Sequence, residues 1–187
     1  MGPALPRPLQ TADGGGFDEV ITAFGRSGAT TGAEAFGVTP DIMNVAKQIT
    51  NGAVPMGAVI ATSEIFDTFM HAGGAQHAIE FPHGYTYSAH PVACAAGLAA
   101  LEMMERENFP AQVNAIAPLF EQKLHALKGH NHIVDIRNYG LAGALQLAPR
   151  NGDPTIRPRD AHMALWEAGF YVRYGGDTLQ FGPPFGT

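Results

Sequence analysis

Apolar residues recur at helical spacing in two long segments near the middle of the chain. The first segment follows Pro91, and its many small apolar residues predict a helix packed closely against another element: Val92, Ala95, Ala96, Ala99, Ala100, Met103 and Met104. The second segment predicts a helix from about Pro110 to Leu127, and Gly129 can end it in the left-handed conformation that glycine tolerates.

The patterns nearer the N-terminus are shorter. Thr39 can cap a helix and Pro40 fits a first helical position, so Val38 to Ile49 is predicted to be helical. Met56 to Ala61 is a short apolar run that predicts a buried strand, and a helix from Glu64 to about His71 follows it.

Beyond Ile133 the apolar period changes from helical to alternating. This change predicts two strands, then a short helix, then a last pair of strands across a glycine turn: Val134 to Arg137, Ala142 to Ala148, residues 159 to 168, Tyr171 to Arg173 and Thr178 to Phe181.

These elements divide the chain into three regions. Residues 1 to 16 are rich in proline and glycine and are expected to be a flexible leader. Residues 17 to 105 alternate strands and helices, which is typical of an α/β domain with a parallel or mixed sheet. Residues 106 to 187 are expected to form a smaller α+β domain.

Composition narrows the functional class. With 45% hydrophobic residues the chain can bury a core, and with 11 Lys and Arg and a net charge of −6 it has no basic stripe for nucleic acid. No apolar run approaches the length that crosses a bilayer, roughly 18 residues. The single cysteine, Cys94, agrees with a reducing compartment, so a cytoplasmic location is expected.

Lys47 is the first candidate for chemistry. It lies on an apolar segment that breaks into a turn, where desolvation would favour the neutral amine that Schiff-base chemistry needs. A pyridoxal phosphate enzyme also needs a carboxylate that keeps the pyridine nitrogen protonated, and Asp18 lies upstream. Taken alone, Lys47 is interpreted as an exposed lysine at a helix end, and Asp18 as a helix cap or a surface charge.

Other reactive residues favour structural roles. Cys94 lies on an alanine-rich helical face, which is typical of a buried, inert thiol. His83 and His90 match no usual zinc spacing, so no metal site is expected. Thr86 has good strand propensity and can be a plain strand residue.

Four motifs in this order carry a resemblance to a known family: Asp18-Glu19-Val20, Phe24-Gly25-Arg26, Ala46-Lys47, and Gly84-Tyr85-Thr86-Tyr87-Ser88-Ala89-His90-Pro91. Together they resemble the class III, pyridoxal-phosphate-dependent aminotransferases of fold type I. The amino-acid sequences of residues 83 to 96 and 136 to 144 are most similar to those of the omega-amino acid:pyruvate, or beta-alanine:pyruvate, branch. The resemblance covers residues 17 to 185.

The resemblance implies a role for each matching residue. Lys47 matches the lysine that forms the Schiff base with pyridoxal 5'-phosphate and shuttles the proton, and Asp18 matches the carboxylate paired with the pyridinium nitrogen. Val20 matches the side chain on one ring face, and Thr86 matches the threonine that reaches the cofactor phosphate of a neighbouring subunit. Arg173 matches the arginine that binds the substrate carboxylate, for which a planar guanidinium is suited.

The implied activity is transfer of an amino group from an omega-amino acid or amine to pyruvate, in a homodimer or homotetramer. Family members are longer, and the phosphate-binding loop lies in the N-terminal half that has no counterpart here. We therefore expect a fragment or a remodelled gene product. Two alternatives stay open at this point: a catalytically silent polypeptide that at most associates with a homologue or itself, and a related aminomutase or decarboxylase.

Overall fold

The computed structural model describes residues 15–72 and 83–185. The chain divides into two compact units. The first unit contains the residues up to Phe24 together with Ala29–Asn108, and the second contains Gly25–Gly28 and the residues from Phe109 onward. A short segment near the start of the chain thus belongs to the unit that the C-terminal half forms. The division into domains at residue 105 stays a prediction.

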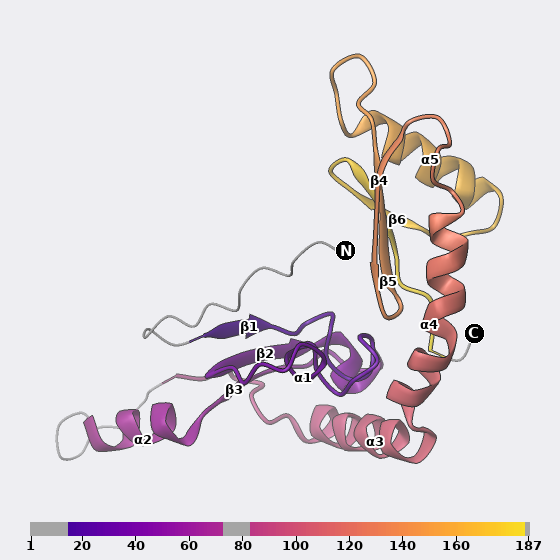
Figure 1. The fold of residues 1–187 in the computed structure, drawn as a ribbon. Coiled ribbons are helices and arrows are strands. Elements are labelled where there is room, and N and C mark those ends of the chain that lie inside the picture. The colour runs from indigo at the N-terminus through magenta and orange to yellow at the C-terminus, as the bar shows by residue number, and fades with distance from the viewer. Residues whose placement is uncertain (1–14, 73–82, 186–187) are drawn as a thin grey trace. The chain divides into compact units, whose positions relative to one another are not determined.

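The first unit is built on a mixed sheet of three strands in the order β1-β2-β3 (Figure 1). Strand β1 (Gly16–Asp18) runs parallel to β2 (Ile42–Ala46), and Asp18 pairs with Asn44. Strand β3 (Gly57–Ala61) runs antiparallel to β2. The parallel pair therefore ends at one common edge of the sheet.

The predicted helix over Val38–Ile49 is wrong. Residues 42–46 form the central strand β2, and only Lys47–Thr50 turn into a short 3₁₀ helix, η1. The Asp41 carboxylate accepts the backbone N–H of Gly15 at 2.7 Å instead of opening a helix. A short apolar run fits a buried strand as well as a helix by periodicity, and here pairing with two neighbours decides.

Three helices accompany this sheet: α1 (Gly32–Ala35), α2 (Ser63–Ala72) and α3 (Pro91–Glu107). The predictions of α2 and α3 are confirmed. The strand predicted at Met56–Ala61 is also confirmed, but its burial is not, since Val59 is 70% and Ile60 is 49% exposed. In the part of the chain that the structure describes, the side chains of β3 are largely uncovered.

The core of the first unit is small. Ala23, Val45 and Ile49 are buried, with Met43 and Met56 packed against them. Helix α3 approaches η1 through Gly97, where an added Cβ would lie 3.5 Å from the carbonyl oxygen of Ile49 in η1 and 3.4 Å from Met56 Sδ. The small residues of α3 therefore serve close packing, as their pattern predicts.

The second unit contains a four-stranded antiparallel sheet in the order β4-β5-β7-β6 and two helices (Figure 1). These elements confirm the helices and strands predicted in this half, with β6 shifted by two residues. In chain order they are α4 (Phe109–His125), β4 (Ile133–Tyr139), β5 (Ala142–Leu147), α5 (Ile156–Glu167), β6 (Arg173–Gly175) and β7 (Thr178–Phe181). The core is a cluster of four leucines: Leu124, Leu145, Leu147 and Leu179.

Arg26 anchors the Gly25–Gly28 segment within this second unit. Its Nη1 donates to the carbonyl oxygens of Leu141 at 3.2 Å and Pro183 at 2.5 Å, and its guanidinium lies 4.5 Å from the centre of the Phe185 ring. The Arg26 carbonyl in turn accepts the N–H of Leu141 at 3.1 Å. Burial lowers the pKa of Arg26.

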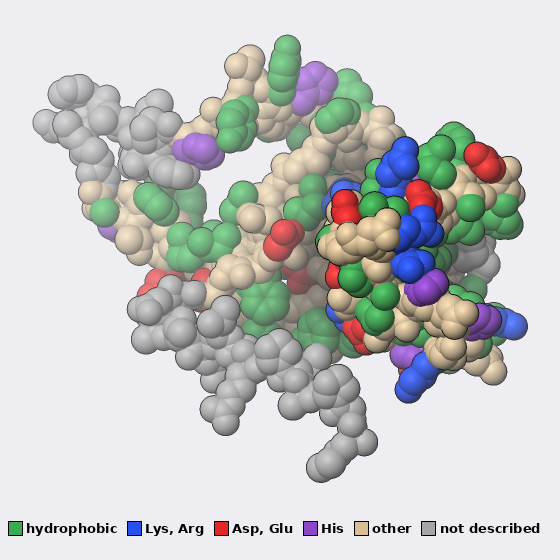
Figure 2. Space-filling view, turned by 90° about the horizontal axis from the view of Figure 1, so that it is seen from above, with side chains coloured by type: hydrophobic (Ala, Val, Ile, Leu, Met, Phe, Trp, Pro, Cys, Tyr) green, Lys and Arg blue, Asp and Glu red, His purple; other side chains and the backbone are tan. Residues whose placement is uncertain are grey.

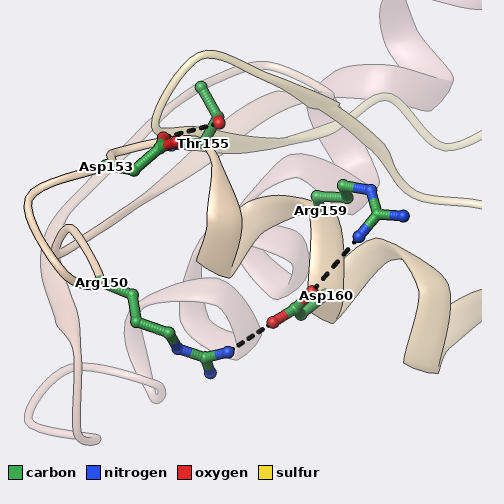
Figure 3. A network of polar contacts seen from close by, with 5 residues as sticks. All are labelled: Arg150, Asp153, Thr155, Arg159 and Asp160. Carbon is green, nitrogen blue, oxygen red and sulfur yellow. Dashed lines mark hydrogen bonds and ion pairs between the residues drawn. The ribbon is translucent and has the colours of Figure 1, made fainter.

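Charged side chains of the second unit pair with one another at the surface. Asp160 accepts from Arg150 at 2.5 Å and lies 3.7 Å from Arg159 (Figure 3). On the face shown in Figure 2, Lys and Arg side chains lie beside Asp and Glu rather than in a separate stripe. Among the described helices none is both long and apolar enough to cross a membrane.

Candidate active site

Asp18 ends strand β1 and is exposed. Its Oδ1 accepts the backbone N–H of Val20 at 3.0 Å, which is a local turn contact. Val20 is half-buried in the turn that follows the strand. Within the described residues the Asp18 carboxylate has no contact with another strand or helix, so one of its oxygens is available to a ligand.

Lys47 lies directly after strand β2 and is also exposed. The predicted desolvation of the Lys47 amine by its own segment is therefore wrong for this chain. Its backbone has φ 52°, a left-handed conformation that is uncommon for a residue with a side chain. Such strain concentrates at functional sites, and here it lies at the candidate lysine.

The sheet brings these two residues to one edge. Strands β1 and β2 are parallel, and Asp18 pairs with Asn44, three residues before Lys47. Ligands of open α/β sheets bind outside the carboxyl ends of parallel strands, which is where both residues lie. A carboxylate and an amine are thus presented on neighbouring strand ends.

Thr86 lies in an exposed turn rather than in a strand, so its interpretation as a plain strand residue is wrong. The Ser88 side chain accepts the backbone N–H of Tyr85 at 3.0 Å and closes this turn. A cavity of about 280 Å³ adjoins the turn, lined by Pro55, Met56, Gly57, Tyr85, Tyr87, Ser88, Ala89, His90, Ala93 and Cys94. Its lining includes neither Lys47 nor Asp18.

Arg173 opens strand β6 of the second unit and is exposed. The backbone carbonyl oxygen of its neighbour Val172 lies 2.7 Å from His162 Nδ1, a hydrogen bond that holds this part of the chain. In the described part of the chain the Arg173 guanidinium has no carboxylate partner, which suits a residue that binds an anionic ligand. The structure brings together Asp18, Val20 and Lys47, whereas Arg173 belongs to the other unit.

Glu19 is the residue that the sequence reasoning missed. Its side chain is only 1% exposed and accepts three hydrogen bonds, from the backbone of Gly32 and Ala33 and from the Thr22 hydroxyl. The only sequence signal is its place between Asp18 and Val20. Among the described residues no cluster of three His, Cys, Asp or Glu side chains is arranged to hold a metal ion.

Comparison with known proteins decides the family. The model of the class-III aminotransferases matches residues 17–187. The chain belongs to this family. The beta-alanine--pyruvate aminotransferase of Pseudomonas aeruginosa is 69% identical over 169 residues, which are 90% of this chain and 38% of that protein. The omega-amino acid--pyruvate aminotransferase of Pseudomonas putida is 64% identical over 171 residues, 91% of this chain and 38% of that protein.

Solved structures agree with this assignment. An amine transaminase from an uncultivated Pseudomonas species, in its PLP-bound (internal aldimine) form, has a TM-score of 0.82 and 36% identity. That match covers 90% of this chain and 39% of the solved chain. The predicted α/β transaminase fold and the resemblance to class III are thereby confirmed. The chain spans about 38% of the length of the curated relatives it matches.

The described residues fit pyridoxal 5'-phosphate in part. An exposed carboxylate and an exposed amine at one sheet edge suit its ring nitrogen and its aldehyde. The phosphate needs donors, and helix N-termini commonly supply them. Here the first two N–H groups of α1 are already bonded to Glu19 and are not available to the phosphate.

Proposed function

We propose that this chain is the lysine-bearing part of an omega-amino acid:pyruvate aminotransferase that works with pyridoxal 5'-phosphate. The observation that carries the proposal is the parallel pair β1 and β2, which presents Asp18 and Lys47 at one edge of the sheet. The identities of 69% and 64% to a beta-alanine--pyruvate and an omega-amino acid--pyruvate aminotransferase support this choice of donor and acceptor.

The bound cofactor would supply an electron sink for the amino-bearing carbon of the substrate. Lys47 would hold the cofactor through its Nζ and, once released, carry a proton at that atom. The Asp18 carboxylate would keep the ring nitrogen protonated, and Val20 would pack on a ring face. Arg173 would bind the substrate carboxylate through two parallel hydrogen bonds.

The proposal extends to assembly and location. Thr86 would donate to the cofactor phosphate of a neighbouring subunit, which requires a homodimer or a homotetramer. The exposed turn that presents Thr86 supports this reading. The cytoplasmic location rests on composition alone.

The test is covalent trapping of the cofactor. The chain is mixed with pyridoxal 5'-phosphate and reduced with borohydride, and mass spectrometry of its peptides locates the label. We expect the label at Lys47 and its loss in Lys47→Ala, while Lys128→Ala, an exposed lysine of the second unit, keeps it. Equal labelling of several lysines, or labelling that persists in Lys47→Ala, contradicts the proposal.

A catalytically silent chain is the second candidate, favoured by the exposure of Val59 and Ile60 on β3. Alanine formation from pyruvate and beta-alanine separates the two, since a silent chain forms none. Release of carbon dioxide without alanine would favour a decarboxylase instead.

A further inference from the structure

We propose that Glu19 is a positioning residue that fixes the carboxylate of Asp18 at the edge of the sheet. This inference rests on the proposed function, because it assigns Asp18 to the ring nitrogen of the cofactor. Within the described residues the Asp18 side chain has only the local hydrogen bond from the Val20 N–H, so its direction depends on the backbone of residues 18–20.

That backbone is held through Glu19 on two sides. The Glu19 N–H donates to the carbonyl of Asn44 in β2 at 2.9 Å, which extends the pairing of the two strands by one residue. The Glu19 side chain lies in the interior of the unit, where its Oε2 accepts the N–H of Gly32 at 2.9 Å and its Oε1 accepts that of Ala33 at 2.6 Å. The residue after Asp18 is therefore tied to both β2 and α1.

The space around this carboxylate is fitted to it. An added Cβ at Gly32 would lie 3.0 Å from Glu19 Oε2 and 3.2 Å from Oε1, so the glycine leaves room for the carboxylate. Thr31 accepts the next N–H of α1, that of Glu34, at 3.0 Å. Glu19 and Thr31 together satisfy the first three N–H groups of α1, whose unpaired burial would cost stability.

Charge adds to this argument. Among the described residues no Lys or Arg pairs with Glu19, so its interactions are those with N–H and hydroxyl donors. Hydrogen bonds to a carboxylate are stronger and more directional than neutral ones. They fix the turn without placing a cation beside Asp18 that would compete with the cofactor.

The experiment is a double-mutant cycle on cofactor affinity. Glu19→Gln replaces one acceptor oxygen by an amide that faces an N–H donor, and we expect it to weaken pyridoxal 5'-phosphate binding about tenfold. In an Asp18→Asn background the same change should have almost no effect, because the carboxylate that Glu19 positions is absent. Equal losses in both backgrounds would mean a merely structural role and would overturn the proposal.

Glu34→Gln is the matched control. Glu34 lies on α1, whose first N–H groups Glu19 accepts, and takes the N–H of Thr30 at 2.9 Å, but it is exposed and, within the described part of the chain, has no hydrogen bond to residues 18–20. We expect its affinity for the cofactor to equal that of the unmodified chain. A loss like that of Glu19→Gln would contradict a specific role for Glu19.

A cofactor-free measurement separates this proposal from the proposed function. Amide hydrogen exchange of Val20 reports the turn directly, because its N–H donates to Asp18. We expect faster exchange in Glu19→Gln and no change in Glu34→Gln. If the unmodified chain fails to bind the cofactor, the proposed function fails, and unchanged Val20 exchange in Glu19→Gln still overturns the positioning role. Thr22→Val, which removes one donor to Glu19, serves where Glu19→Gln does not fold.

Discussion

The two units of the chain differ in how they combine stability with chemistry. The second unit encloses a cluster of four leucines between an antiparallel sheet and its helices. The buried cluster of the first unit is one alanine, one valine and one isoleucine, with Ala33, Ala93 and Met104 buried outside it, and Val59 is 70% exposed on an open sheet. Yet Asp18, Val20, Lys47 and Thr86 all belong to the first unit. The unit that carries the candidate cofactor-binding residues is the one with fewer large buried side chains, while Arg173 belongs to the other.

The two units also differ in how their exposed charged groups are paired. Lys47 and Asp18 are exposed and have no ion pairs in the described part of the chain. In the second unit, by contrast, Arg150 and Arg159 both form ion pairs with Asp160 (Figure 3). Surface ion pairs add little stability, typically about 0 to 1 kcal/mol. The leucine core rather than this network should therefore account for the stability of the second unit.

The largest expected effect comes from the leucine core. Leu145 is 4% exposed, and Leu145→Ala should reduce the free energy of unfolding by about 2 to 5 kcal/mol through lost burial and a cavity. Val45→Ala, the matched change in the first unit, should cost only about 1.5 kcal/mol, since it removes about two buried carbons. Denaturant titration of both variants measures the difference. Equal losses would mean that the two cores contribute alike.

Gly140 tests how closely the second unit packs on the Gly25–Gly28 segment. An added Cβ there would lie 2.4 Å from the Arg26 carbonyl oxygen, and its φ is 54°. Gly140→Ala should therefore destabilise more than Gly129→Ala, whose φ of 91° is also positive but whose Cβ would meet no atom within 4 Å. We expect the excess to be about 1 to 3 kcal/mol, measured by thermal unfolding. Equal shifts would mean that backbone strain alone matters.

Arg26 tests the same segment through its hydrogen bonds. Arg26→Met keeps much of the side-chain volume but loses the donors to Leu141 and Pro183, and should cost about 1 to 3 kcal/mol. Arg106→Met in the first unit removes only an exposed pair with Glu107 and should cost less than about 1 kcal/mol. Hydrogen exchange should show the Arg26 effect in β5 and β7 and none in β2. Matching losses in the two variants would argue against an anchoring role.

The smallest expected effect concerns Asp153. Hydrogen bonds from the Thr155 hydroxyl at 2.7 Å and its backbone N–H lower the pKa of Asp153 below its ordinary value of 3.8. The carboxylate thus stabilises the fold above that ordinary value, and the contribution is lost as the pH falls through the lowered pKa. Thr155→Val should raise the pKa of Asp153, as followed by NMR titration, and change stability only slightly at neutral pH. A pKa that stays lowered would mean that the backbone donor suffices.

Sequence patterns predicted most of the fold where the period was long. Helix α3 has 17 residues and α4 has 17, and each repeats its apolar positions over several turns. Strand β2 has five residues, so its pairing with β1 and β3 rather than its pattern determines its structure. The burial of β3 was wrongly predicted because an apolar run does not reveal what covers it.

The candidate site was predicted unevenly for a similar reason. Lys47 and Asp18 were selected by their motifs, and their roles in this chain stay predictions. Glu19 was missed because its partners, Gly32 and Ala33, approach it only after the chain has turned back on itself. A buried carboxylate with backbone donors has no local sequence signature.

Because Gly25–Gly28 belong to the second unit, recombination between the genes of two relatives can separate residues that pack together. A crossover near residue 109 would transfer the leucine core but leave Arg26 to come from the other parent. Leu141 and Pro183 would then meet whatever side chain that parent supplies. The segments that make up the second unit are therefore discontinuous in the sequence, and chimaeras should keep the stability of this unit only when Gly25–Gly28 are inherited with the C-terminal half.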